Sequence, residues 1–443
     1  QGSYDRKEEA KTERAIEIVK YYPDEKFLIF AHTKRTGERM TKELTHAGIR
    51  NEFHNADLDK EKRISLEKRF KADPSFRVVV ATSTLAWGVN LPSRRVIVLG
   101  VHRGMSEVAT YDIFQMIGRA GRPAYDPAGD AYILVPKSAS SMWRAKLKAQ
   151  QRIESQLLEN MGGNYKLLAF HIVSEIHHKN ITCVEDVREW FERTLAHFQS
   201  KELDDTAVDN VIDLLVNKCY AVKSDDGKLS ATTIGLISSM FYFSPFDVYH
   251  LKRNFGKLFA EGRDGDDIHV ALALADIDSN QMGFTSRAEE EEIVPFENRL
   301  RKAGVDTSNI RRGSLKAAFM YNCLLTGSPT NVMGGAMRGL QFDSPRVLAI
   351  VQALDSMSGK WQKKGFLETL EKRVRYGVPA HLIDLVGVPH LGQVRAGNLF
   401  KAGIKNLEDL VETKPEELMK ITKMSRKLVD EVIEEANIKL ATT

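Results

Sequence analysis

The first third of the chain carries short unbroken apolar runs separated by longer amphipathic stretches. Three of these runs, at 27–30, 77–81 and 95–99, are of strand length and lack alternation, which is typical of strands buried on both faces. The stretches at 33–47 and 61–71 between them repeat apolar residues at helical spacing. Strands that alternate with helices in this way predict an α/β fold, with a parallel sheet covered by helices on both faces.

The pattern changes after Pro136, where helical spacing dominates almost to the end of the chain. The exception is 220–233, in which Asp226-Gly227 separates two short strand-like runs and predicts a hairpin. Helices followed by a small hairpin suggest a winged-helix module. We predict an α/β lobe at 4–149, a winged helix at 150–243, a helical domain at 244–380 and a C-terminal set of short helices at 381–443.

Composition narrows the class of protein. Of 443 residues, 42% are hydrophobic and 28% charged, as in ordinary globular proteins. No apolar run approaches the roughly 18 residues of a membrane span. The three cysteines are far apart, which argues against a disulfide framework and a cysteine-based metal site. The net charge of +4 is weak evidence for a polyanionic partner, and the basic stretch 360–375 also fits a solvated helix face.

The string QMIGRAGRP at 115–123 carries the strongest chemical information. Arg119 and Arg122 are three residues apart, so on a helical turn they project to the same side. Phosphoryl transfer needs cations where charge develops on the transferred group. We therefore interpret both arginines as candidate catalytic fingers, with Gln115 near the γ-phosphate or the attacking water.

This string resembles motif VI of superfamily-two helicases of the Ski-two-like class. The string ATSTLAWGVNLP at 81–92 resembles motif V of the same class, and FLIFAHTK at 27–34 resembles motif IV. Their order and spacing resemble a second RecA-like lobe. Independently, a strand that runs into a loop rich in Thr, Gly and Asn can offer backbone N–H groups to phosphates.

The resemblance implies roles for individual residues. Gly88 and Asn90 would lie at the ATP cleft. Residues beside the phosphates of the nucleic-acid strand would be Thr33, Lys34, His54, Thr82 and Thr84.

The later part of the chain is similar to the archaeal Hjm-type DNA repair helicases. Residues 385–404 resemble a helix–hairpin–helix, in which Gly392 and Arg395 would approach a phosphate. His390 stands where the first hairpin glycine is usual, and a purely structural helical cap is the alternative.

The same family has a long ratchet helix that contacts the single strand. We expect this helix near 345–359, with Arg346 as a strand contact. Trp361 follows shortly after, and either stacking on a base or packing in the protein would explain it. The histidines at 171, 177 and 178 lack a set of acidic or cysteine partners, so we predict no metal site there.

Two strings that a helicase motor needs do not occur in the sequence: GxxxxGKS/T and DExH. ATP and Mg²⁺ would therefore require a further N-terminal lobe, and we expect the chain alone to be inactive. Residues 1–3 resemble the remnant of a protease-cleavable tag, which favours a deliberate truncation over a motor divided between two chains.

The resemblance implies the C-terminal part of an ATP-dependent DNA helicase that moves 3′ to 5′ on single-stranded DNA and unwinds forked duplexes in repair or replication restart. Residues 100–111 would correspond to the duplex-splitting hairpin. Expected partners are single-stranded and forked DNA, with single-strand-binding or fork proteins, and the chain would be a monomer. The protein would be located in the cytoplasm at the nucleoid in an archaeon, or in the nucleus in a eukaryote. The alternatives are an RNA helicase of the same class and a non-catalytic nucleic-acid-binding module.

Overall fold

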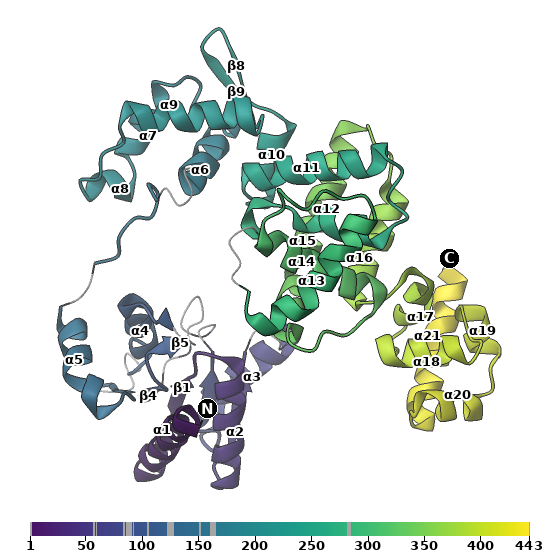
Figure 1. Ribbon diagram of the computed structural model, residues 1–443. Coiled ribbons are helices and arrows are strands. Elements are labelled where there is room, and N and C mark those ends of the chain that lie inside the picture. Colours follow the sequence, from purple (N-terminus) through teal and green to yellow (C-terminus); the bar gives the residue numbers. More distant parts are fainter. Residues whose placement is uncertain are drawn as a thin grey trace. The chain divides into compact units, whose positions relative to one another are not determined.

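Contacts in the computed structural model divide the chain into two compact units, 1–154 and 155–443, each described here by itself (Figure 1). The structure describes residues 2–55, 58, 60–82, 85, 91, 93–103, 106–121, 128–149, 152–159, 165–280 and 285–442.

A five-stranded sheet forms the centre of the first unit. All its pairings are parallel, in the order β2-β3-β1-β4-β7. Its strands are β1 (Phe27–Phe30), β2 (Asn51–His54), β3 (Val78–Ala81), β4 (Arg95–Val98) and β7 (Asp130–Ile133). The apolar runs of the sequence therefore form the central strands, and the predicted parallel sheet is confirmed.

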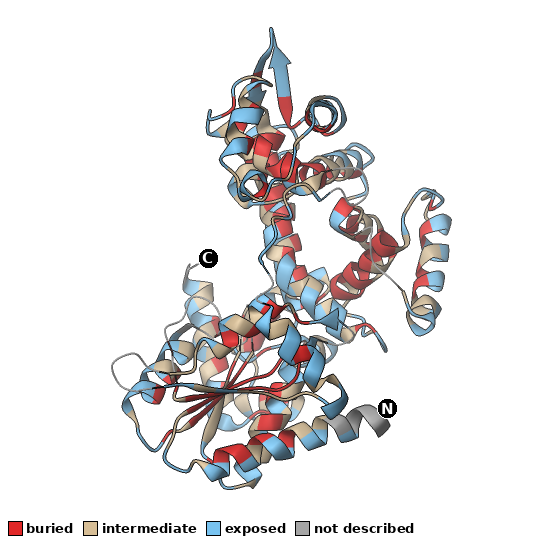
Figure 2. Cartoon of the chain, turned by 90° about the vertical axis from the view of Figure 1, so that its left-hand side faces the viewer, coloured by how far each residue is buried: buried red, intermediate tan, exposed pale blue. Residues whose placement is uncertain are grey.

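Helices cover both faces of this sheet. Successive residues of a strand point to opposite faces, so Phe27 and Ile29 pack on one side while Leu28 and Phe30 pack on the other. Figure 2 shows the buried strands between exposed helical surfaces. The first face is covered by α1 (Gly2–Tyr21) and α2 (Lys34–His46), and the second by α3 (Lys60–Ala72), α4 (Thr110–Ile117) and α5 (Ser140–Lys148).

In its described residues the second unit is helical apart from one hairpin. Its elements are α6 (Lys166–His177), α7 (Asp186–Glu192), α8 (Leu195–Phe198), α9 (Asp205–Asp213), a π-helical turn (Leu214–Lys218), β8 (Val222–Asp225), β9 (Lys228–Ala231), α10 (Thr233–Phe241), α11 (Pro245–Ala260), α12 (Asp267–Ala275), α13 (Arg287–Lys302), α14 (Arg312–Thr326), α15 (Gly334–Ser358), α16 (Lys364–Tyr376), α17 (Ile383–Val386), α18 (Gln393–Lys401), α19 (Leu407–Glu412), α20 (Pro415–Thr422) and α21 (Arg426–Thr442).

The predicted hairpin at 220–233 is present as β8 and β9. Asp226 and Gly227 join the strands with φ angles of 50° and 78°. A two-residue turn with both φ values positive matches the twist of the flanking strands, and Asp-Gly adopts it readily.

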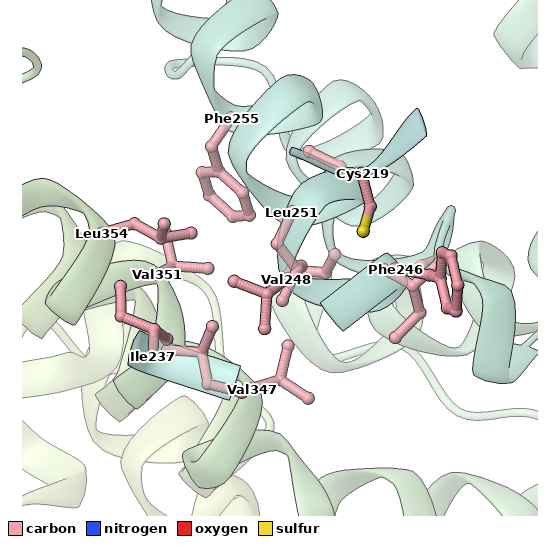
Figure 3. Close-up of a cluster of buried hydrophobic side chains, with 14 of the residues drawn as sticks. Cys219, Ile237, Phe246, Val248, Leu251, Phe255, Val347, Val351 and Leu354 are labelled. Carbon is pink, nitrogen blue, oxygen red and sulfur yellow. The ribbon is translucent and has the colours of Figure 1, made fainter. Parts of the chain in front are cut away.

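One continuous apolar core runs from α6 to α16. Figure 3 shows part of it, where Cys219 and Ile237 lie in the same cluster as Phe255 on α11 and Val351 on α15. The predicted winged helix and the predicted helical domain thus share a core, and the boundary between them stays a prediction. A separate cluster, from Val378 to Ala436, forms the core of the C-terminal helices.

None of the described helices is long and apolar enough to cross a membrane.

Candidate nucleotide and nucleic-acid sites

The carboxyl ends of three neighbouring parallel strands bring together several predicted nucleic-acid contacts. Thr33 and Lys34 follow β1, His54 is the last residue of β2, and Thr82 follows β3. The backbone N–H of Thr82 donates to the carbonyl of His54 over 3.2 Å, which joins two of these loops directly. The structure thus gathers these four positions at one edge of the sheet.

The amino end of α2 lies at this carboxyl edge. Thr33 caps the helix, because its hydroxyl oxygen accepts the backbone N–H of Thr36 at 3.1 Å. Lys34 and Arg35 are exposed in the first turn, which contains no acidic residue. A helix N-terminus with nearby cations suits an anion such as a backbone phosphate.

His54 does not fit the direct contact predicted for it. Its side chain is only 2% exposed, and its Nε2 lies 3.4 Å from the Glu67 carboxylate. Burial lowers the pKa of this histidine. The prediction is therefore corrected: the ring lies inside the lobe, and His54 acts at the edge through the backbone carbonyl that holds Thr82.

His32 also shapes this edge, and the sequence analysis missed it. The ring is buried, and its Nε2 lies 2.6 Å from the carbonyl oxygen of Gly100. Burial lowers the pKa of His32, so the neutral ring donates this hydrogen bond. The contact ties the loop after β1 to the chain entering the segment 100–111. A histidine directly after a buried strand was the available sequence clue.

A short antiparallel hairpin forms in that segment. Its strands are β5 (His102–Arg103) and β6 (Ser106–Glu107). Glu107 forms an ion pair with Lys146 of α5, which anchors the hairpin to the lobe. Residues at the tip, 104 and 105, lie outside the described part, and the duplex-splitting role stays a prediction.

The candidate catalytic segment lies at the opposite edge of the sheet. After α4, the Arg119 carbonyl accepts the N–H of Ser93 at 2.9 Å, and the Gly121 N–H donates to the Ser93 carbonyl at 2.7 Å. Ser93 lies two residues before the start of β4, so these bonds fix the segment at the amino edge. Gln115 is exposed and Arg119 is half-exposed, so neither side chain is locked inside a core.

Four predicted residues lie outside the part of the chain that the structure describes. They are Thr84, Gly88, Asn90 and Arg122.

Gly129 is a further residue on which this segment depends. A Cβ added at Gly129 would lie within 3.0 Å of the backbone of Ala120 and Gly121. Gly121 itself has a φ of +89°, a conformation that glycine adopts without strain. Only a glycine before β7 therefore lets the segment approach Ser93. The sequence offered no clue beyond the glycine itself.

Arg346 has a structural role at the end of a neighbouring helix. Its Nε and Nη2 donate to the carbonyl of Phe241 at 3.1 and 2.7 Å, and Nη2 also reaches the carbonyl of Tyr242. The guanidinium lies over the ring of Phe243, 5.2 Å from its centroid. Arg346 therefore caps the carboxyl end of α10, and because its side chain is exposed its strand contact stays a prediction.

Trp361 packs within the protein, and its stacking on a base stays a prediction. It packs against Phe259, with ring centroids 5.4 Å apart, and it lies beside Gly256. The side chain nevertheless remains half-exposed and lines a surface pocket.

At the helix–hairpin–helix, Gly392 is the exposed residue that precedes α18. Arg395 donates to the carbonyl of His390 over 2.8 Å, so its guanidinium closes the turn between the helices. His390 itself has a φ of +67°, which explains why a glycine is usual there. Phosphate binding by Gly392 and Arg395 stays a prediction.

Comparison with known proteins identifies relatives for both ends of the chain. Residues 10–124 match the family model "Helicase conserved C-terminal domain", and residues 382–437 match "SAM-like Helix-hairpin-helix tandem". The ATP-dependent DNA helicase Hel308 of Pyrococcus horikoshii is 28% identical over 418 residues, which cover 90% of this chain. The chain is therefore similar to the Hel308 helicases over most of its length.

Two further comparisons describe the extent of this likeness. Hel308 of Thermoplasma volcanium is 28% identical over 395 residues, covering 87% of this chain and 56% of the relative. The chain spans 57% of the P. horikoshii relative, little more than half of its length. The C-terminal domain of the DEAD-box protein Dbp5 is 22% identical, with a TM-score of 0.29, over 32% of this chain and 80% of that structure. The predicted RecA-like lobe and helix–hairpin–helix are confirmed.

Proposed function

We propose that this chain forms the C-terminal part of an ATP-dependent DNA helicase that translocates 3′ to 5′ on single-stranded DNA and unwinds forked duplexes. The observation that carries the proposal is the arrangement of one sheet with two chemically distinct edges. Arg119 is fixed at the amino edge, while Thr82 and the amino end of α2 lie at the carboxyl edge. The names of the Hel308 relatives support the same activity.

The two edges give each set of residues a different task. Arg119 would stabilise negative charge developing on the γ-phosphate, and Gln115 would orient the attacking water. Thr33, Lys34 and Thr82 would hold phosphates of the strand. Because the sheet between the edges is a packed unit, a movement of the lobe towards the nucleotide would carry the strand-holding loops with it.

ATP and Mg²⁺ would be held mainly by residues outside this sequence. The described residues contain no group of three or more His, Cys, Asp or Glu side chains placed to hold a metal ion. The sequence has no GxxxxGKS/T string. Mg²⁺ supplies charge neutralisation between the phosphates, while this chain would contribute Arg119 and Gln115 to the other side of the cleft. We therefore expect no ATP hydrolysis by the 443-residue chain alone.

A strand-displacement assay tests the proposal on a polypeptide that contains this chain and the lobe with the ATP-binding strings. Duplexes with a 3′ tail or a 5′ tail, made from DNA or RNA, serve as substrates. We expect unwinding of the 3′-tailed DNA and little unwinding of the other three. Preference for RNA would assign the protein to the RNA helicases of this class, and binding without ATP-dependent unwinding would identify a non-catalytic module.

A further inference from the structure

A pocket of about 410 Å³ lies where the segment before β8 meets α11 and the chain after α15. Its lining contains three aromatic side chains, three cationic side chains and no carboxylate among the described residues. These six side chains are Tyr220, Tyr249, Trp361, Lys252, Arg253 and Lys360. Aromatic rings interleaved with cations are the combination by which proteins bind single-stranded nucleic acid.

The aromatic side chains form an accessible stacking surface. The rings of Tyr220 and Tyr249 lie 5.8 Å apart between centroids, with planes tilted by 47°. Tyr220 is 54% exposed, so its ring is accessible to a ligand. Trp361 presents its half-exposed indole to the same pocket. Stacking on such rings does not depend on base identity, because every base has a π-face.

Two lysines are placed to receive a phosphate. Lys252 and Lys360 are both exposed, and within the described residues neither ammonium has an ion-pair partner. Arg253 differs, because its Nη2 lies 3.5 Å from the Asp276 carboxylate. The positive charge of the two lysines is therefore available to a ligand.

The loop that carries Trp361 is held in place before any ligand arrives. Asp355, which is 5% exposed, accepts the backbone N–H groups of Gln362 at 2.8 Å and Lys363 at 2.7 Å. The indole also packs on Phe259. A ring fixed in this way loses little conformational entropy when a base stacks on it.

We propose that this pocket binds one nucleotide, with the base on the aromatic rings and the phosphate on Lys252 and Lys360. The inference deepens the proposed function and rests on it. An open surface pocket is best suited to a nucleotide that belongs to the bound single strand. A free mononucleotide has the same chemistry, so the experiment includes both sources.

The first test measures binding of a fluorescein-labelled dT20 oligonucleotide to the 443-residue chain by anisotropy over a range of salt concentrations. Tyr220→Ala should weaken binding by about ten-fold. Lys252→Ala and Lys360→Ala should each lower the slope of log K against log salt by roughly 0.7. The matched controls are Phe198→Ala, at an 84% exposed ring on α8, and Lys302→Ala, at an exposed lysine ending α13; neither should change affinity or slope.

The second test uses tryptophan fluorescence. Oligonucleotide binding should quench emission in the unmodified chain, and Trp361→Phe should remove most of that quenching while a phenyl ring preserves the packing. Titration with AMP distinguishes the two sources of nucleotide. If AMP quenches the fluorescence and Tyr220→Ala abolishes this quenching, the pocket also accepts a free nucleotide. If only dT20 quenches the fluorescence, the pocket binds a nucleotide of a strand.

The outcomes separate this inference from the proposed function. If the unmodified chain binds no oligonucleotide, the proposed function fails. If it binds dT20 but the pocket variants behave like their controls, the pocket inference alone is overturned. A further outcome would also overturn the pocket inference. If polyglutamate binds at the pocket while the pocket variants keep their affinity for dT20, the ligand is an acidic peptide.

Discussion

Gly129→Ala tests how the candidate catalytic segment is held at the edge of the sheet. The added methyl would lie within 3.0 Å of the backbone of Ala120 and Gly121, and backbone atoms cannot turn away as a flexible side chain can. Relief of this overlap would separate the segment from Ser93 and break the two hydrogen bonds between them. Overpacking costs about 1–3 kcal/mol, and each lost hydrogen bond about 1 kcal/mol. We expect a loss of about 3 kcal/mol in the free energy of unfolding of the first unit.

Calorimetry and hydrogen exchange on the 443-residue chain measure this effect. For a unit of this size, such a loss should lower the Tm by about 6–12 °C, and the amide of Gly121 should lose its protection. Gly365→Ala is the control, because a methyl there meets nothing within 4 Å. An unchanged Tm together with a protected Gly121 amide would refute the account of how this segment is fixed.

Three further predictions concern the second unit, and each is measured by unfolding of the intact chain. Arg346→Ala should lower the free energy of unfolding by about 1–3 kcal/mol, because the carbonyls at the end of α10 lose a charged donor; unchanged stability would contradict this capping role. Phe255→Ala in the core of Figure 3 should cost about 3–5 kcal/mol in the same measurement, and a cost below 1 kcal/mol would contradict its burial. A hydrogen bond from Arg312 lowers the pKa of Glu290 to about 2, so this carboxylate should stabilise the fold fully above its ordinary pKa of 4.5 and lose that effect as the pH falls through about 2. Glu290→Gln should remove this part of the fall in Tm at low pH. If the variant and the unmodified chain show the same dependence of Tm on pH, the Glu290–Arg312 pair is not the cause of that fall.

The sequence predicted the sheet because local pattern and final environment agree there. The stretches 27–30 and 78–81 are apolar at every position, and the structure buries β1 and β3 on both faces. The hairpin at Asp226-Gly227 was predictable for a related reason, since its two turn residues require a backbone conformation that few other pairs adopt. The motif strings also indicated the loops that follow β1 and β3, where the structure has Thr33 and Thr82.

Side-chain roles were less predictable, because they depend on partners far away in the sequence. His54 is at the predicted edge, but helix α3 covers its ring and turns it into a buried group. Arg346 donates to Phe241, 105 residues earlier in the chain, and no local pattern indicates that contact. Gly129 is needed only because the segment at 120 and 121 passes against it. Motif spacing can therefore indicate at which edge of the sheet a residue lies, while the direction of its side chain depends on tertiary packing.

The most direct test of the account is the DNA-stimulated ATPase rate of a polypeptide that contains this chain together with an ATP-binding lobe, compared between the unmodified protein and Arg119→Ala. The account predicts a fall in kcat of about 10³-fold or more, with an unchanged Kd for single-stranded DNA because the strand-holding loops lie at the other edge of the sheet. An unchanged kcat would contradict the assignment of Arg119 to the nucleotide. It would also contradict the proposal that the amino edge of the sheet serves the nucleotide and the carboxyl edge the nucleic-acid strand.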